Sequence, residues 1–167
     1  NTILQRGRNE SSWKELLILA KDIPVDVRFL ELMPIGEGKE GETISNTTLF
    51  QKIKEIYPDI KPDERKHGNG PAIYYKIPGF EGSIGFISAI HGVFCDSCNR
   101  LRMTSTGELK PCLCYDETIS VRDVARCGDS EKIRENIKHA IQIKPKKHCF
   151  SEIEKVSEKK KMAQIGG

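Results

Sequence analysis

The sequence predicts a chain between the α/β and α+β classes, with one parallel β–α–β step followed by antiparallel hairpins and helices. Two observations support this class. Within residues 2–32, a short β-rich segment is followed by a segment with apolar residues at helical spacing. A strand in which apolar and polar residues alternate comes next. The middle of the chain instead holds pairs of β-rich segments joined by glycine-containing turns, which is typical of hairpins.

The composition is that of a globular protein with a modest core. Of the 167 residues, 37% are hydrophobic and 31% are charged, and no apolar run is long enough to cross a membrane. A net charge of +3 is too small to indicate a nucleic-acid partner. Because the start resembles no signal peptide, we expect a cytoplasmic protein with no membrane partner. The first residue is Asn1, so we expect a truncated protein or part of a longer one.

The first β–α–β step is predicted over residues 2–32. A strand at 2–4 is followed by a helix that begins with a Ser12–Glu15 capping box and ends near Pro24. Residues 25–32 alternate apolar and polar side chains and form the clearest strand. The helix should bury one apolar face, made of Trp13, Leu16, Leu17 and Ala20.

The next elements are a helix and a hairpin. A glycine- and charge-rich loop at 36–42 is taken as a domain boundary, so that residues 1–36 and 37–167 form two regions. A helix over 47–57 should be capped by Ser45 or Asn46, and residues 58–71 read as loop. Strands at 72–77 and 83–90 should pair as a hairpin. The inward face of the helix is predicted to hold Leu49, Ile53 and Ile56.

The last part of the chain repeats this mixture. Residues 100–103 and 108–112 can pair across the turn at 105–107. A helical turn is expected at 121–125, and Ser130 should cap a longer helix that Pro145 ends. The buried stripe of that helix is predicted to be Ile133, Ile137 and Ile141.

Three cysteines near the middle of the chain indicate a metal centre. Cys95 and Cys98 lie on one short loop, and Cys112 can return to them across the hairpin. Thiolates bind zinc and iron–sulfur clusters, although both usually need four ligands. Six cysteines without a signal peptide favour metal binding or free thiols over structural disulfides. A Cys95–Cys98 disulfide after oxidation is the remaining alternative.

The fourth ligand would decide the function. Cys114 could close a structural zinc ribbon, which would be a non-catalytic interaction module. If Cys114 does not bind, an open coordination position is left for a small molecule. Cys127 and Cys149 stand alone in the sequence, so each is expected to be a small buried or half-buried residue.

Two arginines follow the cysteine loop. On a strand Arg100 and Arg102 share one face, with Leu101 and Met103 on the other. Two guanidinium groups can bind a phosphate or carbonyl, and an ordinary solvated strand face is about equally favoured. Lys110 could add charge from across the hairpin.

Four other positions have a structural and a functional interpretation. Arg28 and Glu31 could form an exposed pair, or Arg28 could face a site at the end of its strand. Met33 at the same strand end is typical of core. His91, before the first cysteine, is either an alternate ligand or a loop residue without a role.

Several motifs together resemble a known enzyme family. The segments FCDSCNRLRMTS and GELKPCL, the earlier VRFLELMPIGEG and the terminal IGG are similar to the C-terminal half of molybdenum cofactor biosynthesis protein A. That family is the radical S-adenosylmethionine GTP 3′,8-cyclase. The resemblance covers essentially the whole chain. It implies the end of an incomplete TIM-type barrel over residues 1–36, followed by a cluster- and GTP-binding region.

The resemblance also implies site residues and cofactors. Cys95, Cys98 and Cys112 would hold a 4Fe–4S cluster whose open iron binds the guanine of GTP, and no residue here would be a catalytic acid or base. A second 4Fe–4S cluster, which cleaves S-adenosylmethionine, would belong to a missing N-terminal half, because no Cx3CxxC motif is present. This chain alone is therefore expected to be inactive, and homodimer formation is left open. The remaining implied contacts are Arg100, Leu101 and Arg102 with GTP, Met33 with S-adenosylmethionine, and Gly166 and Gly167 near the active site.

Overall fold

The computed structural model describes residues 1–165 of the chain. These residues form two compact units. The first combines Asn1–Met33 with Gly41–Phe94, and the second combines Pro34–Glu40 with the chain from Cys95 onward. Within the described residues, no helix is both long and apolar enough to span a bilayer.

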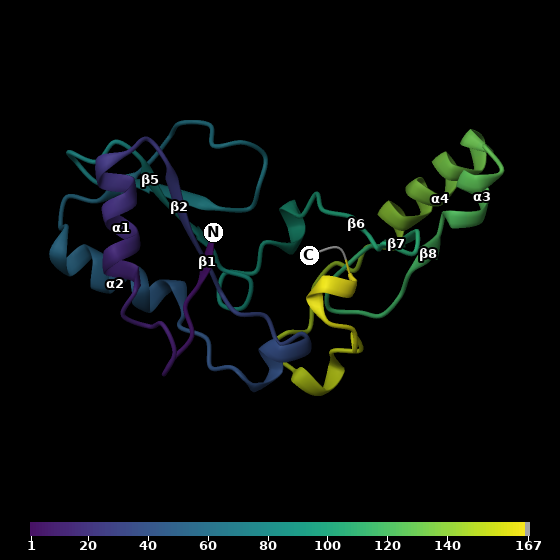
Figure 1. The fold of residues 1–167 in the computed structure, drawn as a ribbon, viewed down its shortest axis with the longest axis horizontal. Coiled ribbons are helices and arrows are strands. Elements are labelled where there is room, and N and C mark those ends of the chain that lie inside the picture. Colours follow the sequence, from purple (N-terminus) through teal and green to yellow (C-terminus); the bar gives the residue numbers. More distant parts are fainter. Residues whose placement is uncertain (166–167) are drawn as a thin grey trace. The chain divides into compact units, whose positions relative to one another are not determined.

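The first unit is built on a mixed five-stranded sheet (Figure 1). The strand order is β1-β2-β5-β4-β3, with β2 parallel to both β1 and β5 and the other pairs antiparallel. The predicted β–α–β step and the predicted hairpin are therefore both confirmed. The bounds are β1 (Thr2–Ile3), β2 (Asp26–Leu30), β3 (Lys61–Pro62), β4 (Ile73–Lys76) and β5 (Ser83–Ile87).

Helices α1 (Trp13–Asp22) and α2 (Asn46–Ile56) bury their apolar faces in the core of this unit. Ser45 caps α2 by accepting a hydrogen bond from the Thr48 backbone N–H. Burial of these faces removes apolar surface from water and is the main stabilising term. The largest side chains of the core are Trp13, Leu17, Phe29, Leu49, Ile53, Ile84 and Phe86.

Two details of these helices differ from the prediction. Ser12 makes no capping bond, because its backbone is already helical (φ −66°, ψ −11°), whereas a capping residue is extended. Ile56 is 51% exposed, because the buried face of α2 ends one turn earlier at Ile53.

The second unit contains a three-stranded antiparallel sheet in the order β6-β7-β8. The predicted hairpin is confirmed in a shorter form, with Arg102 opposite Lys110 and Met103 opposite Leu109. Gly107 turns the chain with φ +79°, a conformation that L side chains rarely adopt. The elements are β6 (Arg102–Met103), β7 (Glu108–Lys110), β8 (Ile119–Ser120), α3 (Arg122–Arg126) and α4 (Ser130–Gln142). Short 3-10 helices lie at Gly36–Glu40, Cys95–Ser97, Ile153–Lys155 and Met162–Gln164.

Helix α4 contacts the sheet through a narrower face than predicted. Ala140 is its one fully buried residue and packs against Leu109 and Val121, whereas Ile137 and Ile141 are 38% and 54% exposed. The small Ala140 side chain lets the helix approach the sheet closely. The larger isoleucines therefore lie beside this contact and stay partly exposed. The helix is capped by Asp129 rather than Ser130, since the Asp129 carboxylate accepts from the Lys132 N–H.

Candidate metal and nucleotide site

Three half-buried thiols of the second unit stand where the sequence predicts metal ligands. Cys95 begins a 3-10 turn that the Cys98 N–H closes onto the Cys95 carbonyl at 3.1 Å. Cys112 comes two residues after β7. All three are free thiols of intermediate exposure. The turn and the hairpin therefore each supply thiols, as predicted.

Cys112 interacts electrostatically with both other thiols. Burial raises the pKa of Cys112, and the charges of Cys95 and Cys98 raise it further, while the Cys114 N–H and the Lys144 ammonium oppose the rise. Thiolate sulfur is the donor that iron–sulfur clusters and zinc prefer. The donor set therefore fits a thiolate-bound centre in its chemistry. In its present form the described chain holds no ready-made group of three His, Cys, Asp or Glu ligands.

Lys144 lies at this centre, although nothing in the motif reading pointed to it. Its ammonium donates to the Arg100 carbonyl at 2.7 Å, to the Pro111 carbonyl at 2.9 Å and to the Cys98 sulfur at 3.7 Å. The His148 backbone N–H lies 3.4 Å from the Cys95 sulfur. The one sequence signal was a lysine between the end of a helix and Pro145.

Cys114 is engaged with Cys149. It is fully buried, its sulfur lies 2.7 Å from that of Cys149, and it accepts from the Cys149 N–H at 3.1 Å. Burial, followed by the hydrogen bond with Cys149, raises the pKa of Cys114 to about 12. Cys149 is buried as predicted, whereas Cys127 is exposed because it ends the short helix α3 at the surface.

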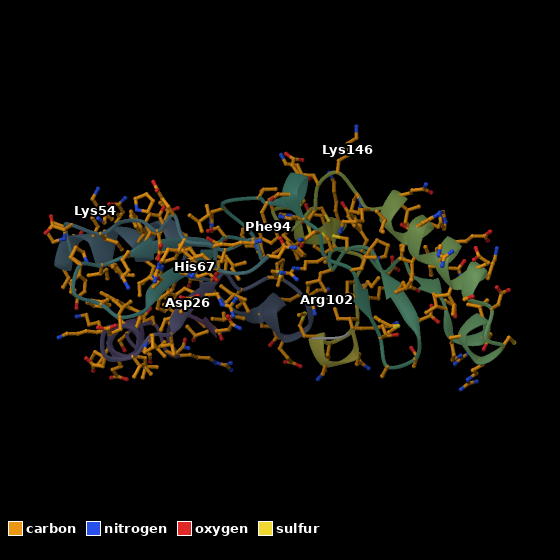
Figure 2. The ribbon with its side chains drawn as sticks, turned by 90° about the horizontal axis from the view of Figure 1, so that it is seen from above. Asp26, Lys54, His67, Phe94, Arg102 and Lys146 are labelled. Carbon is orange, nitrogen blue, oxygen red and sulfur yellow. The ribbon has the colours of Figure 1, made fainter. Side chains whose placement is uncertain are left out.

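The two arginines lie at the start of the hairpin. Arg102 belongs to β6 and is half-buried (Figure 2). Arg100 is exposed and precedes the strand. Leu101 between them packs against the Leu109 core, so it anchors this segment. Lys110 does not add charge here, contrary to the prediction, because its ammonium is buried in an ion pair with Glu158.

In the first unit, Glu31 organises the loop after β5. The buried carboxylate accepts from the N–H groups of Asn46 (3.0 Å), Ile90 (2.7 Å) and His91 (2.9 Å). Burial alone would raise the pKa of Glu31, but these bonds outweigh it and the pKa lies below its usual value. The first of the two alternatives, an exposed pair with Arg28, is therefore wrong, because Glu31 is buried. His91 has a structural role in this loop, since its Nδ1 lies 3.0 Å from Glu31.

Two other predicted residues lie on or just after β2. Arg28 has a buried Nε with no hydrogen-bond partner among the described atoms. Met33 is half-buried just beyond the end of β2. Gly166 and Gly167 lie outside the described residues.

A polar cluster that the sequence reading missed fixes the loop over residues 58–71. His67 lies 2.9 Å from Asp26 (Figure 2). It also lies 3.1 Å from Asp63, and its ring stacks on Tyr74 at 4.0 Å. Ser83 donates to Asp63 at 2.6 Å. The cluster links the loop to β2, β4 and β5. These residues are far apart in sequence, so no local pattern marks them.

The family follows from a comparison of the sequence with known proteins. The family described as Molybdenum Cofactor Synthesis C matches residues 25–150, a range that includes all three thiols and Lys144. The chain belongs to this molybdenum cofactor synthesis family. The family range also contains Cys149 and both arginines.

Individual curated relatives extend the comparison to the whole chain. This chain is 43% identical over 168 residues to a protein named GTP 3′,8-cyclase from Clostridium perfringens (strain 13 / Type A). Proteins of the same name from Alkaliphilus metalliredigens and Petrotoga mobilis are 38% and 36% identical. Each match covers 100% of this chain but only 51–52% of the relative. The chain therefore spans about half the length of these relatives.

Proposed function

We propose that the chain is the C-terminal portion of a GTP 3′,8-cyclase. The complete enzyme would convert GTP to (8S)-3′,8-cyclo-7,8-dihydroguanosine 5′-triphosphate, the first step of molybdenum cofactor synthesis. The observation that carries the proposal is the match of the entire chain to relatives of that name, with Cys95, Cys98 and Cys112 inside the matched region. Residues 1–36 would end an incomplete barrel, and residues 37–167 would form the cluster- and GTP-binding region.

Cys95, Cys98 and Cys112 would hold a 4Fe–4S cluster. Three thiolates leave one iron without a protein ligand, and that iron would supply a coordination position for the guanine of GTP. The engagement of Cys114 with Cys149 supports this arrangement, because it withholds the fourth thiol. The same contact argues against the zinc-ribbon alternative, which needs Cys114 as its closing ligand.

The arginines would bind the anionic part of GTP. Guanidinium groups donate paired hydrogen bonds to phosphate, and Arg100 and Arg102 stand on the segment between the cysteine loop and the hairpin turn. Leu101 would contact GTP through its backbone, since its side chain packs into the core. Met33 would contact S-adenosylmethionine in the complete enzyme.

Catalysis in this half would rest on positioning and electrostatics. The 5′-deoxyadenosyl radical that abstracts hydrogen from the ribose would come from a second cluster in the other half of the relatives' length. The residues described above would hold GTP, and none of them would act as a proton donor or acceptor in the reaction. The chain alone is therefore expected to bind GTP without cyclising it.

Anaerobic reconstitution followed by iron and sulfide assay tests the cluster. We expect about four irons per chain, lost in Cys112→Ala and retained in Cys114→Ala. One tightly held zinc that disappears in Cys114→Ala would overturn the proposal and favour the zinc ribbon.

GTP binding to the reconstituted chain tests the nucleotide site. Arg100→Ala should weaken binding about 10–100-fold, the cost of losing a hydrogen bond to a charged group. Arg134→Ala is the matched control, because Arg134 is exposed on α4 and pairs with Glu131. Equal affinity of both variants would remove the nucleotide assignment.

A further inference from the structure

We infer that Lys144 is a positioning residue that ties together the two chain segments carrying the metal ligands and tunes the centre they form. This inference rests on the proposed function for the identity of the centre. Its structural part, the tying of the segments, stands on contacts of the chain itself.

The Lys144 ammonium bridges both arms of the site. Its contact with the Arg100 carbonyl and the Cys98 sulfur reaches the loop between the first two ligands and β6. Its contact with the Pro111 carbonyl reaches the residue before Cys112. Lys144 therefore connects the segment that carries Cys98 with the segment that carries Cys112. Without Lys144 these segments are linked by the β6–β7 hairpin.

These three contacts use the full capacity of the side chain. A lysine ammonium has three N–H donors and no acceptor, and three acceptors lie within hydrogen-bond distance. The side chain is half-buried. This saturation distinguishes Lys144 from a surface lysine that happens to lie near a carbonyl.

The end of α4 places Lys144 and its neighbours over the thiols. The helix closes at Ile143, whose N–H bonds the His139 carbonyl, and Pro145 cannot continue it. The chain then passes along the site, where the His148 N–H faces Cys95 and the Cys149 N–H donates to Cys114. Residues 144–149 thus supply N–H groups to two of the predicted ligand sulfurs and to the sulfur of Cys114.

Such contacts have two expected consequences for a bound centre. Residues that orient metal ligands typically contribute 10–100-fold to metal affinity. Hydrogen bonds to cysteine sulfurs also stabilise the more negative, reduced state of an iron–sulfur cluster and so raise its potential. A charged donor at the Cys98 sulfur should act in the same direction.

The test compares Lys144→Met, Lys144→Arg and Lys146→Met in the reconstituted 167-residue chain. Lys146 is the matched control, because it removes the same charge from the same segment and its side chain extends away from the ribbon (Figure 2). We expect Lys144→Met to release iron to a chelator at least about 10-fold faster than Lys146→Met. Its midpoint potential should shift to more negative values, and Lys144→Arg should restore most of that shift because it keeps a charged N–H donor.

Equal release rates for Lys144→Met and Lys146→Met would overturn the inference, and so would faster release with an unchanged potential. Hydrogen exchange of the metal-free chain supplies an independent readout. Lys144→Met should increase exchange in residues 95–102 and 108–112, and unchanged exchange there would also refute the tying role. If the wild type takes up zinc or no metal, the proposed function fails, while the exchange experiment still decides the role of Lys144.

Discussion

Replacing Lys110 by methionine should destabilise the second unit strongly. The Lys110 and Glu158 side chains are 1% and 2% exposed, and their charged groups contact one another directly. Burial alone would raise the pKa of Glu158, but the Lys110 ammonium and the Lys160 N–H outweigh it, so the carboxylate stays charged. Lys110→Met leaves that charge buried without its partner.

Breaking a buried ion pair on one side costs about 3–5 kcal/mol. With a urea dependence of about 1–3 kcal/mol per molar, the midpoint of unfolding should fall by at least about 1 M. Removing both charges in Lys110→Met/Glu158→Leu should recover much of this loss, because apolar pairs often replace buried ion pairs at little cost. Lys155→Met, in the exposed pair with Glu152, is the control and should change little.

Unfolding can be followed separately in the two units. The single tryptophan, Trp13, belongs to the first unit, so its fluorescence should not change midpoint in Lys110→Met. Hydrogen exchange of residues 108–120, measured at increasing urea concentration, reports the unfolding midpoint of the second unit. The exchange rate of these residues should rise in Lys110→Met. A midpoint in that region within about 0.2 M of the wild type would refute the reasoning, since it would mean that the buried charge needs no partner.

Two further predictions concern the first unit. Glu31→Gln should lower the free energy of unfolding by about 2–4 kcal/mol, because the new amide N–H group faces backbone donors; Trp13 fluorescence in urea measures it, and Glu55→Gln on the exposed side of α2 should have no effect. The Asp63 carboxylate has a pKa far below its usual range, chiefly because Arg65 donates to it. A lowered folded pKa stabilises the fold above the unfolded value of about 3.9 and ceases to do so as the pH falls below it. The melting temperature of the wild type should therefore fall more steeply below about pH 4 than that of Asp63→Asn, and parallel curves would contradict this.

Elements with a strong local pattern could be predicted from the sequence. The strand at Asp26–Leu30 alternates apolar and polar residues, and helix α2 begins at a serine cap. The grouping of the three thiols follows from their spacing, which is a local property of the chain, and their role as metal ligands stays a prediction. The short strands β3, within the predicted loop over 58–71, and β8 were missed, since two residues carry no periodicity.

Contacts across long stretches of sequence could not be predicted. The Cys114–Cys149 contact spans 35 residues and the Lys144–Cys98 contact spans 46. The burial of Lys110 depends on Glu158, which no pattern links to it. In each case the side chain contacts a partner that is distant in the sequence and that only the tertiary fold brings near. The contact gives the side chain a role that the local sequence does not indicate.

The placement of Lys144 also sets the order in which the site can be assembled. Cys112 and Lys144 are 32 positions apart in the sequence, so at about 5–20 residues per second a ribosome needs about 2–6 s to pass from one to the other. During that interval the thiols have been synthesised but lack the lysine and the N–H groups of residues 144–149. The cysteine loop is thus completed only after α4 has been made, and insertion of the metal is best timed to follow that event.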